Sequence, residues 1–184
     1  GAKMEVENIA KFFSASIYTG DKVTKKHFLN TAKNANLLHL AMHAEVNNDE
    51  PGLSRLLFGN TENDENHLYL EEIYGMNIGA DLAVLSACNT GFGKETAKKS
   101  MASFQRAFTF AGVPATVASL WQVPDQATSQ IMEGFYSYLS QGFSKSNSLQ
   151  KSKKDYLRQN KNTKLSEPYF WAGFVLYGSD EHIV

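Results

Sequence analysis

The chain contains a single cysteine and almost no net charge. With one cysteine no intrachain disulfide can form, which argues against a small secreted disulfide scaffold and favours a reducing compartment, the cytoplasm. The formal net charge of −1 gives no reason to expect nucleic acid as a direct partner. No apolar run approaches the roughly 20 residues that cross a bilayer, so we expect no membrane partner.

Motifs that hold nucleotides or metals are also missing. Gly91-Phe-Gly93 lacks the further glycine or lysine of a phosphate-binding loop. Cysteine, histidine and carboxylate residues do not cluster at zinc-like spacings, and His39 with His43 is not followed by a suitably placed glutamate. We therefore expect no cofactor and no metal. The other histidines lie in polar contexts and are expected to be solvated: His27, His67 and His182.

Four short apolar stretches are present, each mostly apolar in both strand phases. This pattern is typical of central strands in a parallel sheet covered on both faces. A fifth and weaker candidate strand is Leu53 to Phe58. The four main stretches are Leu37 to Met42, Leu82 to Ala87, Ala115 to Trp121 and Trp171 to Tyr177.

Helical patterns alternate with these strands, which favours an α/β fold with a mostly parallel sheet flanked by helices. With 184 residues, of which 42% are hydrophobic, we expect one domain, from Met4 to Val184, with Gly1 to Lys3 a cloning remnant. The expected helices are Thr24 to Ala35, Leu68 to Tyr74, Ser100 to Phe110, a helix opening at Pro124-Asp125, and Asn147 to Gln159.

Active sites in open parallel sheets gather beyond the carboxyl ends of the strands. The first stretch leads to His43 and the second to Cys88, so neighbouring strands would bring an imidazole and a thiol to one edge. A thiolate can attack a carbonyl carbon while an imidazole accepts and returns a proton. The alternative is that Cys88 is a small buried hydrophobe, which is the commonest role of a lone cysteine.

Four blocks of the chain, in this order, resemble CHAT-domain proteins. They are Leu37-Leu-His-Leu-Ala-Met-His43, Leu82-Ala-Val-Leu-Ser-Ala-Cys-Asn-Thr-Gly91, Val117-Ala-Ser-Leu-Trp-Gln-Val-Pro-Asp-Gln-Ala-Thr128 and Pro168-Tyr-Phe-Trp-Ala-Gly-Phe-Val-Leu-Tyr-Gly178. The similarity covers roughly Glu5 to Gly178. CHAT domains are related to caspases, separases and gingipains, so the resemblance implies a caspase-like fold and peptide-bond hydrolysis by a Cys–His dyad.

The resemblance also implies roles for individual residues. Cys88 matches the nucleophile and His43 the general acid and base, while the backbone N–H groups of Cys88 and Ala44 would bind the oxyanion. The family usually has glycine where this chain has Ala44, and alanine resists a backbone with positive φ. An inactive peptidase-like module that binds peptides or partner proteins is therefore the alternative function.

Substrate contacts are implied for the segment after the third strand. Ser119, Leu120, Trp121 and Gln122 would lie along the substrate backbone, although Trp121 can equally be a core residue. Asp125 resembles an acidic residue that selects a basic side chain before the cut, or it caps the following helix. The family often carries upstream strands and helical repeats that this chain lacks, so a regulatory repeat domain or partner protein is expected beside the protein or peptide substrate.

Overall fold

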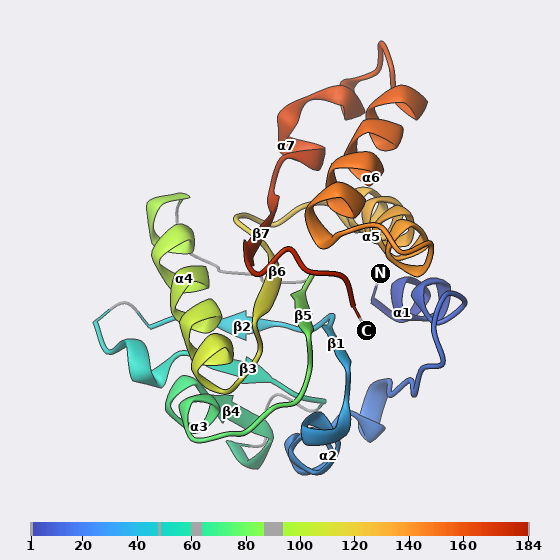
Figure 1. Cartoon of the computed structure of the whole chain (residues 1–184). Helices are drawn as coiled ribbons and strands as arrows, with labels where there is room; N and C mark the ends of the chain where they lie inside the picture. The colour runs from blue at the N-terminus through green and yellow to red at the C-terminus, as the bar shows by residue number, and fades with distance from the viewer. Residues whose placement is uncertain (1, 48, 60–63, 87–93, 184) are drawn as a thin grey trace.

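Two β-sheets and seven α-helices make up the part of the chain that the computed structural model describes, residues 2–47, 49–59, 64–86 and 94–183. For residues 94–101 and Asp21 the backbone alone is described. Figure 1 shows the larger sheet between two sets of helices, with the smaller sheet at one end of it. The arrangement is a layered α/β fold.

The larger sheet has four strands in the order β1-β5-β6-β7. β1 (Leu37–Leu40), β5 (Leu82–Leu85) and β6 (Ala115–Ser119) run parallel, whereas β7 (Phe174–Gly178) pairs antiparallel with β6. All residues of β5 and β6 are buried, as expected for strands that have a partner on each side and helices on both faces.

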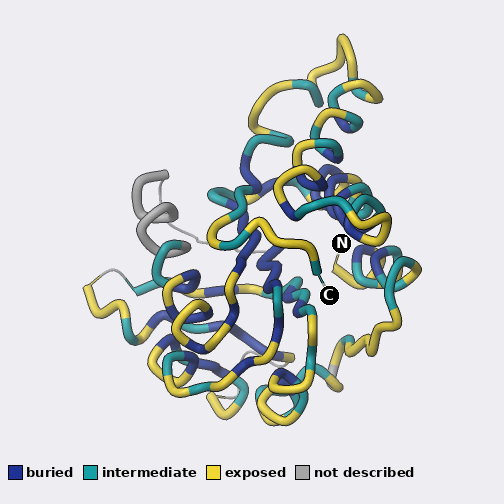
Figure 2. The backbone as a smooth tube through the Cα atoms, viewed as in Figure 1, coloured by how far each residue is buried: buried dark blue, intermediate teal, exposed yellow. Residues whose placement is uncertain are grey.

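Alternate side chains of these strands enter two separate cores. One core joins Leu38, Leu40 and Leu85 to helices α2, α3 and α4 and to the small sheet. The other joins Val84 and Val117 to helices α1, α5 and α6. Figure 2 shows the burial concentrated along the strands and on the inner faces of the helices. The period of two along each strand therefore separates the molecule into two apolar layers.

The smaller sheet is antiparallel, with the order β2-β3-β4. Its strands are β2 (Ala44–Glu45), β3 (Arg55–Leu57) and β4 (His67–Tyr69). The inward residues Ala44, Leu56 and Leu68 are almost completely buried and pack in the first core. This sheet follows β1 in the chain, so it lies beside the segment that contains His43.

The helices differ in length and in how they start. The α-helices are α1 (Ala2–Ile9), α2 (Lys25–Thr31), α3 (Leu70–Tyr74), α4 (Lys94–Phe110), α5 (Asp125–Ser140), α6 (Lys145–Gln159) and α7 (Pro168–Trp171). Short 3₁₀ turns are Gly20–Lys22, Ala32–Asn34, Pro51–Leu53, Asp64–Asn66 and Lys164–Ser166. Thr24 and Ser144 cap α2 and α6 by accepting the backbone N–H of His27 and Asn147 respectively.

The predicted α/β fold with a mostly parallel sheet is confirmed. The prediction that the fourth apolar stretch forms a central parallel strand was wrong. Its first part forms the end of α7, where Pro168 occupies the first helical turn. The remainder, β7, is an antiparallel strand at the edge of the sheet. β1 is likewise at an edge within the described residues, and its burial alternates. The predicted helix from Leu68 begins as strand β4 and becomes α3 at Leu70.

A buried polar contact holds α1 and α5 against β1. His39 of β1 lies 2.9 Å, Nδ1 to hydroxyl oxygen, from Tyr136 of α5, and 3.0 Å, Nε2 to Oε1, from Glu5 of α1. Tyr136 is fully buried. This burial, together with the nearby Glu5 carboxylate, raises the pKa of Tyr136 well above its ordinary value of 10.0. The Tyr136 hydroxyl therefore stays protonated in the folded protein.

The raised pKa of Tyr136 predicts a loss of stability at alkaline pH. Above pH 10 the unfolded chain releases the Tyr136 proton while the folded chain retains it, so the free energy of unfolding falls as pH rises. In Tyr136→Phe this fall should be shallower, and at pH 7 the variant should lose about 1 kcal/mol with its hydrogen bond to His39. Urea unfolding between pH 7 and pH 11 measures both effects. An unchanged slope, with exposed Tyr177→Phe as the reference, would contradict the assignment.

Candidate active site

The carboxyl ends of β1 and β5 lie side by side. Leu40 pairs with Leu85 in the parallel register, and the Ser86 N–H donates to the Leu40 carbonyl over 3.2 Å. The chain continues from β1 to His43 and from β5 to Cys88. The two strands are therefore neighbours, which is the condition for His43 and Cys88 to reach one edge of the sheet. Cys88 itself lies outside the described residues, so its distance from His43 stays a prediction.

His43 is solvent-exposed and immediately precedes β2. Its carbonyl accepts the N–H of Leu57 over 3.0 Å, which continues the β2–β3 pairing by one residue. Because side chains alternate along a strand, His43 shares the outer face with Glu45, while Ala44 points into the core. The imidazole of His43 is therefore available to a molecule that approaches from solvent.

The backbone of Ala44 bears directly on the predicted oxyanion site. Among the described residues other than glycine, only Asn162 has a positive φ, so Ala44 is accommodated in an extended strand. Ala44 lies opposite Leu56, between two positions whose backbone groups face β3. Successive peptide groups of a strand point in opposite directions, so the Ala44 N–H is directed away from β3. The Ala44 N–H is therefore not used in the β2–β3 pairing.

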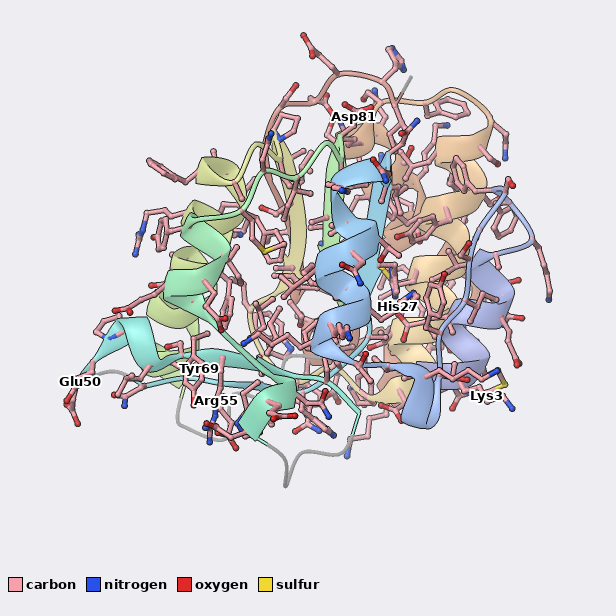
Figure 3. The ribbon with its side chains drawn as sticks, turned by 90° about the horizontal axis from the view of Figure 1, so that it is seen from below. Lys3, His27, Glu50, Arg55, Tyr69 and Asp81 are labelled. Carbon is pink, nitrogen blue, oxygen red and sulfur yellow. The ribbon has the colours of Figure 1, made fainter. Side chains whose placement is uncertain are left out.

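A charged and aromatic cluster occupies the outer face beyond His43. Arg55 binds Glu45 through Nε at 2.8 Å and a terminal nitrogen at 2.6 Å, and it also donates to the Tyr69 hydroxyl over 3.1 Å. Tyr69 in turn donates to Asp64 over 2.9 Å. Figure 3 shows Arg55 and Tyr69 together at one end of the molecule, opposite Asp81, which precedes β5. The cluster is therefore on the side of the strands' carboxyl ends.

The same cluster corrects the prediction for His67. Its side chain is 7% exposed, and Nδ1 lies 2.7 Å from Asp64, so His67 is not solvated. Hydrogen bonds from Tyr69 and then from His67 lower the pKa of Asp64 below its usual value of 3.8. In the sequence, Arg55, His67 and Tyr69 alternate with buried leucines, as expected for the outer face of a sheet. Each strand is only three residues long, which is too short for this alternation to be recognised.

The end of β6 is fixed by contacts with the segment before β7. Ser119 is buried, and its hydroxyl donates to the carbonyl of Trp121. The Leu120 N–H donates to the Gly173 carbonyl over 2.9 Å, and the Trp121 indole donates to the Tyr169 carbonyl over 2.8 Å. Trp121 also packs against the second core, in agreement with the core alternative for this residue. A substrate-binding role for Ser119, Leu120 and Trp121 stays a prediction.

Gln122 and Asp125 are both exposed just beyond this corner. Pro124 is the N-cap residue of α5, and Asp125 is the first residue inside the helix. Asp125 therefore does not cap α5 in the strict sense, although a carboxylate in the first turn interacts favourably with the helix dipole. Its exposed position at the carboxyl end of β6 is compatible with the predicted contact to a basic substrate side chain, which stays untested.

A cavity of about 770 Å³ lies along the outer edge of β1. It is lined by α1, α2, residues 13–18 and β1, and by none of the predicted site residues that the structure describes. Within the described ranges, no group of three or more metal-ligating side chains gathers. None of the helices seen in those ranges is both long and apolar enough to cross a membrane.

Comparison with known proteins agrees with this geometry. The chain is similar to tetratricopeptide repeat protein 28 of mouse and of human, each 34% identical over 109 residues, or 59% of the chain. The matched part is only 4% of the length of each relative. The family model of the CHAT domain matches residues 1–179. The chain therefore belongs to the CHAT-domain family and has its caspase-like fold.

Proposed function

We propose that this chain is a cysteine endopeptidase that cleaves protein substrates with a Cys88–His43 dyad. The observation that carries the proposal is the parallel pairing of β1 with β5, which brings the strand before His43 beside the strand before Cys88. His43 is exposed, as a residue that meets a substrate must be. Membership of a peptidase-related family supports the same assignment.

The chemistry assigns one proton carrier and one nucleophile. His43 takes the proton of the Cys88 thiol, and the thiolate forms a bond to the carbonyl carbon of the scissile peptide. The C–N bond then breaks as the imidazolium of His43 returns the proton to the departing amine, leaving a thioester. A water molecule, deprotonated by His43, attacks the thioester and releases the acid and the free thiol.

Negative charge on the carbonyl oxygen must be stabilised during both attacks. The Ala44 N–H supports this role because it points away from β3 and lies one residue after the general base. The backbone N–H of Cys88 is the proposed second donor. Two such donors bind the oxyanion more strongly than the planar carbonyl oxygen, which lowers the barrier to attack.

Substrate selection is assigned to the carboxyl end of β6. We place the substrate backbone along residues 119–122 and a basic side chain against the exposed carboxylate of Asp125. An arginine or lysine before the cut is therefore the expected preference.

Regulation by a partner is the remaining part of the proposal. The relatives are named for tetratricopeptide repeats, and the chain matches a small fraction of their length. We infer that a helical repeat domain or a partner protein controls access to the dyad in the cytoplasm. A module that binds peptides without cleaving them is the second candidate, because Ala44 replaces the glycine that is usual in the family.

Two substitutions distinguish these functions. A thiol reagent carried on a short peptide should label Cys88 in the wild type, and labelling should fall at least about tenfold in His43→Ala, because the imidazole promotes thiolate formation. Cleavage of a peptide library should be lost in Cys88→Ala. Mass spectrometry measures both. Equal labelling in His43→Ala would favour the binding module, and cleavage by Cys88→Ala would exclude Cys88 as the nucleophile.

The proposed oxyanion donor can be removed by a proline. Ala44→Pro lacks the backbone N–H, which should lower kcat by about 10² to 10³ with little change in KM. Ala44→Gly keeps the N–H and should retain activity. Steady-state kinetics measure the difference, and thermal unfolding of each variant checks that the fold is retained. If Ala44→Pro is too unstable, Ala44→Gly still decides, because a loss of activity in that variant would contradict an N–H role.

Specificity is tested at Asp125. In a library profile of the wild type we expect arginine or lysine before the cleaved bond, and in Asp125→Lys this preference should disappear because like charges repel. Glu7→Lys on α1 is the matched reversal of an exposed charge away from the site. Selection of apolar residues by the wild type, or an unchanged preference in Asp125→Lys, would refute the assignment of this carboxylate.

A further inference from the structure

A buried polar network lies just inside the ends of the two strands that lead to the dyad. It joins Glu5 of α1, His39 of β1, Ser86 after β5 and Tyr136 of α5. His39 Nε2 is 3.0 Å from Glu5 Oε1 and 3.3 Å from the Ser86 hydroxyl oxygen. The four residues come from four different elements, and none of their side chains is more than 8% exposed.

Both ring nitrogens of His39 have partners in the network. The Tyr136 hydroxyl, which stays protonated in the folded protein, lies 2.9 Å from Nδ1. The Glu5 carboxylate and, over the longer distance, the Ser86 hydroxyl contact Nε2. His39 is thus fixed on both ring nitrogens.

The network lies at the last residue pairs of β1 and β5, at the carboxyl ends of the two strands. The Ser86 N–H donates to Leu40, and the Ser86 hydroxyl contacts His39, so one residue binds both the backbone and a side chain of β1. In the sequence, Ser86 precedes Cys88 by two residues and Leu40 precedes His43 by three. Whatever fixes Ser86 against β1 therefore fixes the starting points of both segments that contain the dyad.

Stability alone does not account for these residues. Buried polar groups must be desolvated, and a packed apolar set of the same volume is often as stable. A fully satisfied polar network, in contrast, permits one arrangement of the groups that share it. The position of this network, at the strand ends and not in the middle of the sheet, points to geometry as what it maintains.

We propose that Ser86 and His39, held by Glu5 and Tyr136, are positioning residues that set the geometry between Cys88 and His43. The proposal rests on the proposed dyad. It assigns to α1 a part in the active site, because Glu5 is that helix's polar contact with His39. Loss of the Ser86 hydroxyl leaves the sheet paired but loosens the strand end before Cys88.

The experiment uses the only thiol of the chain as its probe. The rate of alkylation by iodoacetamide is measured from pH 5 to pH 10 on the full chain, which requires no substrate. In the wild type the apparent pKa of the Cys88 thiol should lie below the free value of about 8.5, and His43→Ala should return it there. Ser86→Ala should shift the apparent pKa upward by about half a unit or more, and kcat should fall roughly tenfold with KM unchanged.

Three variants separate positioning from simple loss of stability. Ser152→Ala removes another buried hydroxyl, which bonds the Ile131 carbonyl between α6 and α5, and it should leave the thiol profile unchanged. Ser86→Thr keeps a hydroxyl at this position and should keep the pH profile of alkylation seen in the wild type. His39→Phe keeps an aromatic ring without the hydrogen bonds and should resemble Ser86→Ala.

The outcomes separate the proposed dyad from the proposed positioning role. If His43→Ala leaves the thiol profile unchanged, there is no coupled pair, and both the dyad and its positioning are refuted. If His43→Ala shifts the profile while Ser86→Ala behaves like Ser152→Ala, the dyad stands and the positioning role is overturned. If Ser86→Ala is too unstable to assay, His39→Phe decides by the same comparison.

Discussion

The parallel pairing of β1 with β5 is the constraint on which the rest of the molecule depends. It joins four residues of one strand to four of the other, from Leu37 with Leu82 to Leu40 with Leu85. Because the strands are parallel, their carboxyl ends reach the same edge of the sheet. The two apolar cores on either side of the sheet hold this register, since a shift of β5 by one residue would move its side chains from one core to the other.

Much of this framework could be predicted from the sequence, because its signals are local and strong. The apolar runs of β5 and β6 satisfy both faces of a covered strand, and the spacing of Phe104, Ala107 and Phe108 matches one buried helical face. The beginning of α4 at Lys94 gave no such signal, since its first turns contain mainly lysine, threonine and glutamate. The strand ends also indicated His43 and Cys88 as candidate site residues, and the proximity of these two residues stays a prediction.

Other features could not be predicted, for identifiable physical reasons. An apolar run looks the same whether the strand is parallel or antiparallel, so the direction of β7 was not available from its residues. The strands of the small sheet have two or three residues each, too few to show a period. His39 lies in an apolar run, but its polar partners Glu5 and Tyr136 come from distant positions in the chain. His67 stands among polar residues that give no indication of burial, although its partner Asp64 is only three residues away.

The connection between α5 and α6 has a consequence for the order in which the chain folds. These helices pack together and are joined only by residues 141–144, so their contact closes a very short loop. The β1–β5 pairing instead closes a loop that contains the whole small sheet and α3. Contacts between neighbours in the chain form faster than contacts across long loops. We therefore expect the α5–α6 hairpin to assemble early and the alignment of the strands leading to His43 and Cys88 to come late. The proposed Cys88–His43 dyad would then be assembled only when folding is complete.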